Sequence, residues 1–330
     1  MAVTANTNET YDVTTIREDL SEAMASITPT ETIFMSTIGS RNVDNTYFEW
    51  SEVDLAATGA NRQIEGDVGI ANTAPTNAVR KGGYTQISAK VVEVSSTNQA
   101  VNGVANAQTV AKQVAYKLSE LKRDMEAMLL DNVAAAAGAS GTARQTAGLP
   151  AYLTTNVSRG AGGANGTTSG AGEAGSVNAA ATDGTLRPLT EALFKGVIAD
   201  CWNAGATPSV VMCGSGQKQK ISTFTGNATR FKEAEDSKLN AAIDVYISDF
   251  GEVQVVPNRH MRVRTVTGVD YTPDVFILDP SYAEVAYLQT AKQEALAKTG
   301  LSERRLISCE YGLQVTSQKA HGIVADVNAA

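Results

Sequence analysis

The apolar residues in the first half of the chain follow a helical period. Val104–Ala137 contains neither Gly nor Pro. Its apolar residues recur at steps of three and four, which places them on one face of an α-helix: Val110, Val114, Leu118, Leu121, Met125, Met128 or Leu129, and Val133. Such a helix would be roughly 50 Å long, about the width of a whole domain. With almost no catalytic residue types nearby, the pattern indicates a building element and not an enzyme core.

Two strand patterns precede this helix. Thr46–Val53 and Thr85–Thr97 read as strands, and the second is rich in Val, Ile and Thr. The segment between them contains several glycines and Pro75, and Tyr84 is its only aromatic residue. It has too little apolar surface to form a core. We expect a long hairpin that projects and becomes ordered by lying on another surface, with a flexible surface loop as the alternative.

The N-terminal residues predict a polar tail followed by a short helix. Residues 1–14 are polar, and Thr15–Glu18 fits a capping box, in which side chains satisfy the free amides of a helix start. Pro29 ends the helical pattern. About a dozen residues are too few for a helix to persist alone in water. The helix is therefore expected to dock on its own body or on a neighbouring molecule.

The second half of the chain predicts a second body after a glycine-rich stretch. Gly138–Gly184 is rich in Gly, Ala, Ser and Thr, which indicates irregular structure without a core. From Leu186 onward the pattern predicts a helix containing Leu189–Trp202, short strands, a polar helix at Gln217–Thr223, and a last long strand at Arg305–Ser317. The short strands are Ser209–Cys213, Val245–Ile247, Val253–Val256 and Val275–Leu278.

Charge and cysteine usage narrow the class of protein. The chain has 330 residues and a formal net charge of −8. Tight DNA binders need clustered Lys and Arg, so an acidic chain is not a DNA-binding protein in the usual sense. No apolar run is long enough for a transmembrane helix, and the polar start of the chain has no secretory signal pattern. Cys201, Cys213 and Cys309 lack metal-site spacing and read as buried, reduced thiols.

Few residues suggest catalytic or binding chemistry. Cys213, His260 and Asp279 are the residue types of a nucleophilic triad, but nothing in their spacing selects them. Neither histidine, His260 nor His321, has a nearby metal-ligand partner. We therefore predict no catalytic, cofactor-binding or metal residues.

Two further motifs have a simpler explanation than binding. Gly214–Lys218 follows a strand and opens a helix, as a phosphate loop would, but it lacks the P-loop pattern. Lys122, Arg123, Asp124 and Glu126 mix both charge signs, with Lys122 and Glu126 four residues apart. This spacing is typical of a solvated or subunit-facing stripe and not of a binding site.

The order of these parts resembles the major capsid proteins of tailed double-stranded DNA bacteriophages, which have the Hong Kong 97 (HK-97-like) fold. Local motifs are similar to one capsid subfamily along nearly the whole chain, except for the Gly-rich segment. They are Tyr11–Leu20, Ile27–Thr32, Asn45–Thr46, Glu49–Trp50, Arg80 through Thr85–Ile87, Val94–Thr97, Asp249–Gly251, Leu278–Pro280, Lys298–Gly300 and Lys319–Gly322.

The resemblance implies an α+β fold and a structural function, with no enzyme activity and no cofactor. It implies an N-terminal arm at 1–45, an extended hairpin loop at 46–103, the spine helix of the peripheral domain at 104–140, a Gly-rich surface insertion at 141–185, an axial α/β domain at 186–290, and return strands of the peripheral domain with the C-terminus at 291–330. Some members of this fold crosslink through a Lys and an Asn, but no motif marks Lys81 as reactive, and crosslinking is not carried over.

By the same resemblance, many copies would form an icosahedral shell around a double-stranded DNA phage genome. The expected partners are further copies in pentamers and hexamers, a separate scaffolding protein, a portal and a decoration protein, with packaged DNA nearby but not specifically bound and no membrane. The expected location is the virion capsid, after assembly in the host bacterial cytoplasm. Two alternatives stay open: an encapsulin-like protein compartment, and a soluble α/β enzyme that uses Gly214–Lys218 as a nucleotide-binding loop.

Overall fold

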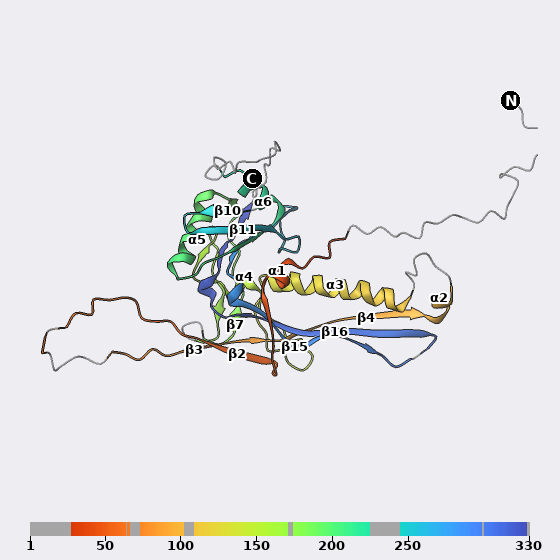
Figure 1. Ribbon diagram of the computed structural model, residues 1–330. Helices are drawn as coiled ribbons and strands as arrows, with labels where there is room; N and C mark the ends of the chain where they lie inside the picture. Colours follow the sequence, from red (N-terminus) through yellow and green to blue (C-terminus); the bar gives the residue numbers. More distant parts are fainter. Residues whose placement is uncertain are drawn as a thin grey trace, which may run out of the picture.

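The computed structural model of the chain (Figure 1) describes residues 28–63, 65–66, 73–101, 109–170, 174–224, 245–298 and 300–328. The polar tail and the capping-box helix up to residue 27 lie outside these residues. Figure 1 shows a compact body at the top, a long helix beside a sheet that extends to one side, and a hairpin loop that extends to the other.

A four-stranded sheet and a long helix form the extended part of the molecule. The strand order is β1 (Gly39–Asn42), β15 (Ala283–Ala295), β16 (Ser302–Val315) and β4 (Gln86–Ser95). β16 runs antiparallel to both of its neighbours, β15 and β4, and β1 runs parallel to β15. The helix α3 (Val110–Leu130) packs on one face of this sheet, where Leu121, Met125 and Leu129 are buried. The predicted apolar stripe is thus confirmed. At the position where the pattern allowed either Met128 or Leu129, Leu129 is the buried residue.

α3 ends seven residues earlier than the sequence predicts. Its last residue is Leu130, and Asp131 is extended (φ −80°, ψ 155°). The Ala-rich residues that follow pair with distant backbone instead: the Ala135 amide donates to the Val177 carbonyl, and Ala136 pairs with Gln145. Long-range pairing outweighs the helix propensity of the Ala run here. The predicted first turns, at residues 104–108, lie outside the described residues.

The hairpin pairs differently from the prediction. β2 (Tyr47–Glu52) pairs with β3 (Val79–Tyr84), a strand that the sequence placed in the loop, whereas β4 pairs with β16. Gly82 and Gly83, which the sequence placed in the glycine-containing loop, lie in β3 because aromatic rings cross them. A Cβ at Gly82 would lie 2.2 Å from the Tyr47 hydroxyl, and one at Gly83 would lie 2.9 Å from the Phe48 ring.

A six-stranded sheet forms the core of the compact body. Its order is β10 (Val245–Ser248), β11 (Gly251–Pro257), β9 (Val210–Cys213), β14 (Val275–Leu278), β17 (Gly322–Val324) and β5 (Val157–Ser158). The four strands predicted within 186–290 are present. The helices α5 (Glu191–Asn203) and α6 (Ser215–Ser222) lie against one face of this sheet. β5 and β17 come from outside 186–290, so this body also uses the Gly-rich segment and the C-terminus.

The two parts share one core. Val210, Met212, Phe276 and Leu278 on the second face of the six-stranded sheet belong to the same apolar cluster as Leu121 of α3. Short elements complete the structure: α1 (Ile33–Thr37), α2 (Ser96–Ala100), α4 (Leu149–Tyr152), β6 (Thr167–Thr168), β7 (Val177–Ala179), β8 (Arg187–Pro188), β12 (Arg264–Val266), β13 (Val269–Tyr271), η3 (Pro280–Tyr282), η4 (Gln318–Ala320) and β18 (Val327–Asn328).

The Gly-rich segment is part of the fold, and its interpretation as a surface insertion without a core is wrong. Leu149 and Leu153 are almost completely buried in the shared core. The Asp326 carboxylate accepts hydrogen bonds from the amides of Gly160 (3.0 Å) and Gly184 (2.9 Å). A Cβ at Gly160 would lie 2.1 Å from the Thr185 carbonyl oxygen. The glycines therefore allow backbones to pack closely where larger residues would clash.

Candidate assembly surfaces

The structure does not join the triad candidates Cys213, His260 and Asp279 by hydrogen bonds within the described residues. Burial raises the pKa of the Cys213 thiol to about 12, so the thiolate is not formed near neutral pH. The Asp279 amide donates to Nδ1 of His321 (3.4 Å), and the His260 amide donates to the Asn258 side chain (2.8 Å).

The Gly214–Lys218 loop is filled by its own neighbours. α6 begins at Ser215, and the Lys218 ammonium donates to the Val255 carbonyl (2.8 Å). A Cβ at Gly214 would lie 2.1 Å from the Thr272 hydroxyl, which donates to the Gln217 side chain (2.7 Å). Since Lys218 and Gln217 are both used inside the protein, the loop is not arranged around a phosphate.

The cysteines behave as the sequence predicts. Cys201, Cys213 and Cys309 are free and buried. Across the described ranges, no three His, Cys, Asp or Glu side chains are grouped to hold a metal ion. None of the helices in these ranges is both long and apolar enough to cross a membrane.

Aromatic residues fix the root of the projecting hairpin to the sheet. The rings of Phe48 and Trp50 in β2 stack with centroids 5.9 Å apart, and they pack with Ala286 of β15. Phe48 also lies against Gly312, where a Cβ would be only 2.7 Å from the ring. Because Tyr311 and Leu313 point toward α3, Gly312 points to the opposite side of the sheet. The hairpin root therefore covers the near end of the sheet face that α3 leaves open.

Two ion pairs flank the same root. Lys81 of β3 pairs with Glu52 of β2, so it ties the two strands of the root together, and both side chains are largely buried. Lys319, near the C-terminus, pairs with Asp54 at the start of the loop and links the hairpin to the body. On either side of Asp54, Val53 and Leu55 are 55% and 84% exposed. The loop thus leaves the root with apolar side chains in solvent.

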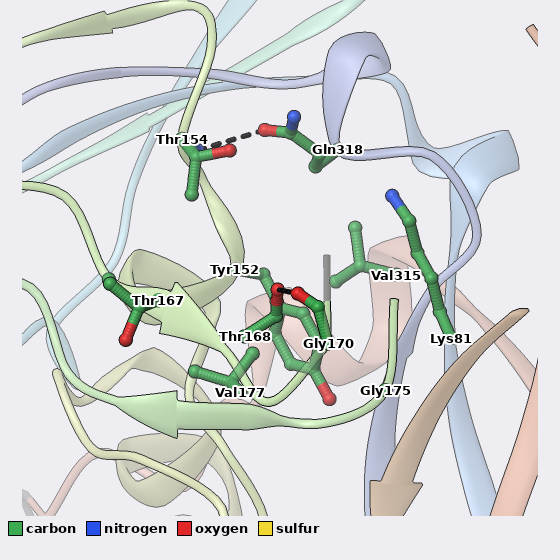
Figure 2. A pocket seen from close by; sticks show the side chains of 11 residues that line it. Lys81, Tyr152, Thr154, Thr167, Thr168, Gly170, Gly175, Val177, Val315 and Gln318 are labelled. Carbon is green, nitrogen blue, oxygen red and sulfur yellow. Dashed lines mark hydrogen bonds between the residues drawn. The ribbon is translucent and has the colours of Figure 1, made fainter. Parts of the chain in front are cut away.

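A cavity of about 350 Å³ lies beside this root (Figure 2). Lys81, Tyr152 and Gln318 line it together with residues of the Gly-rich segment. The Gln318 side chain accepts hydrogen bonds from the amides of Thr154 (2.8 Å) and Thr155 (3.1 Å), and the Tyr152 hydroxyl donates to the Leu313 carbonyl (3.1 Å). The Gln318 and Tyr152 side chains that line the cavity therefore use their polar atoms in hydrogen bonds within the protein.

Next to the hairpin root, the same sheet face has apolar side chains that no described residue covers. Ile87 and Val91 of β4 are 60% and 47% exposed, and they alternate with the buried Val92 and Val94, which pack toward α3. Leu306 of β16 is the cross-strand partner of Val91. We call Ile87, Val91 and Leu306 the open sheet face. It continues the surface that the hairpin root covers at the near end.

Sequence reasoning missed the role of Glu126. Its side chain is fully buried, although the charge pattern predicted a solvated or subunit-facing stripe. Oε1 accepts from the Phe34 amide (2.6 Å) and from Nδ2 of Asn258 (2.8 Å), and Oε2 accepts from the Met35 amide (2.9 Å). The carboxylate joins α1, α3 and the loop after β11. A local charge pattern carries no signal for partners this distant in sequence.

Comparisons with solved structures show the fold of this chain. The capsid of a native GTA particle has a TM-score of 0.62 and is 14% identical, with 96% of this chain and 97% of that chain covered. The holo-SrpI encapsulin complex from Synechococcus elongatus has a TM-score of 0.54 and is 11% identical, with 96% and 94% covered. At these identities the likeness shows the fold, which is the HK-97-like fold that the sequence resemblance implied.

Sequence comparisons give the family. The major capsid protein of Escherichia phage Phieco32 is 32% identical over 133 residues, which are 40% of this chain and 35% of that protein. The matched stretch thus spans about a third of that relative. The model of the family described as "SU10 major capsid protein" matches residues 3–328 of this chain. The chain therefore belongs to this family of phage major capsid proteins. The capsid interpretation is confirmed over the encapsulin alternative.

Proposed function

We propose that many copies of this chain, as pentamers and hexamers, form a closed icosahedral shell around a double-stranded DNA phage genome. The observation that carries the proposal is a pair of apolar surfaces that are exposed within the described residues. The hairpin loop leaves its root with Val53 and Leu55 exposed, and the open sheet face lies along β4 and β16 on the other side of the root.

The contact that we propose is head-to-tail. Within one subunit, Phe48 and Trp50 of the hairpin root already pack on the near end of the sheet face. The loop of a neighbouring copy would cover the open sheet face, with Val53 and Leu55 against Ile87 and Val91. Contacts of this kind use two different surfaces and close into rings when the rotation between subunits allows it. Many such weak contacts add up across a shell.

The other parts of the functional assignment belong to the same proposal. The chain acts as a structural protein without catalytic activity. Residues 1–45 serve as an arm, 186–290 contribute the axial domain, and a scaffolding protein, a portal and a decoration protein are separate partners. Assembly takes place in the host bacterial cytoplasm. The burial of Cys213 and the internal use of Lys218 support a role without catalysis.

A charge-swap experiment tests the proposed contact. Leu55→Asp and Ile87→Lys each place a charge on one side of it, and both positions are exposed in the subunit. Each variant should therefore fold normally and lose shell formation, because the unpaired charge must be desolvated. The double variant should recover shells by pairing the two charges. Light scattering and negative-stain microscopy measure the result. Shells formed equally well by all variants would contradict the contact.

A further inference from the structure

The charges of α3 are sorted onto separate sides of the helix. The acidic side chains Glu120 and Asp124 turn toward β4, where Lys90 lies 2.6 Å from Asp124 and 3.5 Å from Glu120. Lys117 also pairs with Glu120 at 2.8 Å. Glu126 is buried under α1 and satisfied by neutral donors. The acidic groups of this helix are therefore used within the subunit.

Apart from Lys117, the basic groups of α3 point away from these acidic partners. Lys112 and Arg123 are eleven residues apart, which is close to three full turns and about 16 Å along the axis, so they share one line of the helix. Lys122 precedes Arg123 and projects about 100° around the helix from it, which widens the basic surface to one side. Lys112 lies over the ring of Tyr116 at 5.8 Å, and Lys122 is exposed. In the part of the chain that the structure describes, none of these three side chains has an ion-pair partner. We call Lys112, Lys122 and Arg123 the spine stripe.

The chemistry of the stripe fits a polyanion better than a protein partner. Protein interfaces depend on buried aromatic or aliphatic anchors, and Tyr116, at 39% exposed, is the large apolar side chain of this face. Ala115 and Ser119 separate the basic residues and leave room for a phosphate backbone. Three cations neutralise about three phosphates, which gives a weak, salt-sensitive contact per subunit.

We propose that the spine stripe faces the interior of the shell and contacts the phosphates of packaged double-stranded DNA. This inference rests on the proposed shell function. A weak contact repeated over many copies would hold the outer layer of DNA in place. The net charge of −8 on each subunit would keep any single contact from becoming tight, so that DNA can still move during filling.

Formaldehyde crosslinking of purified DNA-filled particles, followed by mass spectrometry, tests the contact on the unaltered protein. Peptides with Lys112 and Lys122 should carry nucleotide adducts several-fold more often than peptides with the exposed Lys292 and Lys298. If DNA-filled shells form and the stripe lysines carry no adducts, or are linked to another protein instead, the inference is wrong and the shell function stands. If the unaltered chain forms no DNA-filled shells, both are wrong.

A matched pair of variants gives a second readout. Particles of the triple variant Lys112→Gln/Lys122→Gln/Arg123→Gln should release their DNA at a salt concentration at least about two-fold lower than unaltered particles do, because the phosphate contacts are lost. The control is Lys292→Gln/Lys298→Gln/Arg259→Gln, which removes the same number of positive charges from exposed positions elsewhere. Equal shifts in both variants would reduce the effect to net charge and overturn the inference.

Discussion

At the scale of single residues, buried polar groups decide how this chain holds together. His321 is 1% exposed, and burial lowers its pKa from 6.5 to about 4. Glu126 is fully buried, and its hydrogen-bond partners among the described residues are neutral donors. Both have partners that lie far away in sequence, as the Asp279 amide does for His321. Neither role could be predicted from the sequence, because local spacing says nothing about such partners.

His321 should make the subunit sensitive to acid. Its pKa is lower in the folded state than in the unfolded chain, so the unfolded chain binds the proton first as pH falls. The stabilisation is complete above pH 6.5 and is lost between pH 6.5 and about 4, by about 3 kcal/mol in total. Urea unfolding across this range should show that His321→Gln has a shallower loss than the unaltered chain. Parallel curves would contradict the assignment.

Glu126→Gln should destabilise the subunit although the side chain keeps its size. The amide has one acceptor oxygen in place of two, so at least one of the amides of Phe34 and Met35 loses its partner. A buried unsatisfied donor costs about 1–3 kcal/mol. Glu120→Gln is the control, because its ion pair with Lys117 is partly exposed and worth under about 1 kcal/mol. Equal losses in the two variants, measured by urea unfolding, would argue against a special role for Glu126.

At the scale of elements, period and composition predicted some segments and misled on others. The apolar stripe of α3 and the core strands β9, β11 and β14 carry strong local patterns and were predicted. β3 was missed because Gly82 and Gly83 look like a turn, although they make room for Tyr47 and Phe48. β15 was missed because its far half, from Gln289 to Ala295, is exposed and polar, with no alternation to detect.

Glycine substitutions should separate the two uses of glycine in this chain. Gly160→Ala would place a Cβ 2.1 Å from the Thr185 carbonyl oxygen, so the backbone must shift at a cost of about 1–3 kcal/mol. Gly196→Ala lies inside α5 with open space around it and should stabilise the subunit by up to about 1 kcal/mol. Thermal unfolding of both variants checks the signs. A neutral Gly160→Ala would restore the view that the Gly-rich segment is only a surface insertion.

At the scale of the whole molecule, the fold combines a packed body with apolar surfaces that no other described residue covers. One core runs through α3, the four-stranded sheet and one face of the six-stranded sheet. The hairpin loop extends in one direction from its root, and β4 and β16, which carry the open sheet face, extend in the other (Figure 1). The sequence predicted that a hairpin projects, but only the structure shows where its root packs and which face stays bare.

The central claim is that this chain builds a closed shell, and the most direct test is the mass and shape of what the purified protein forms. The full chain, alone or co-expressed with a candidate scaffolding protein, should form particles of megadalton mass in light scattering. Negative-stain microscopy should show closed, icosahedral outlines of uniform diameter. A persistent monomer or dimer under every assembly condition, with a well-folded subunit, would contradict the account.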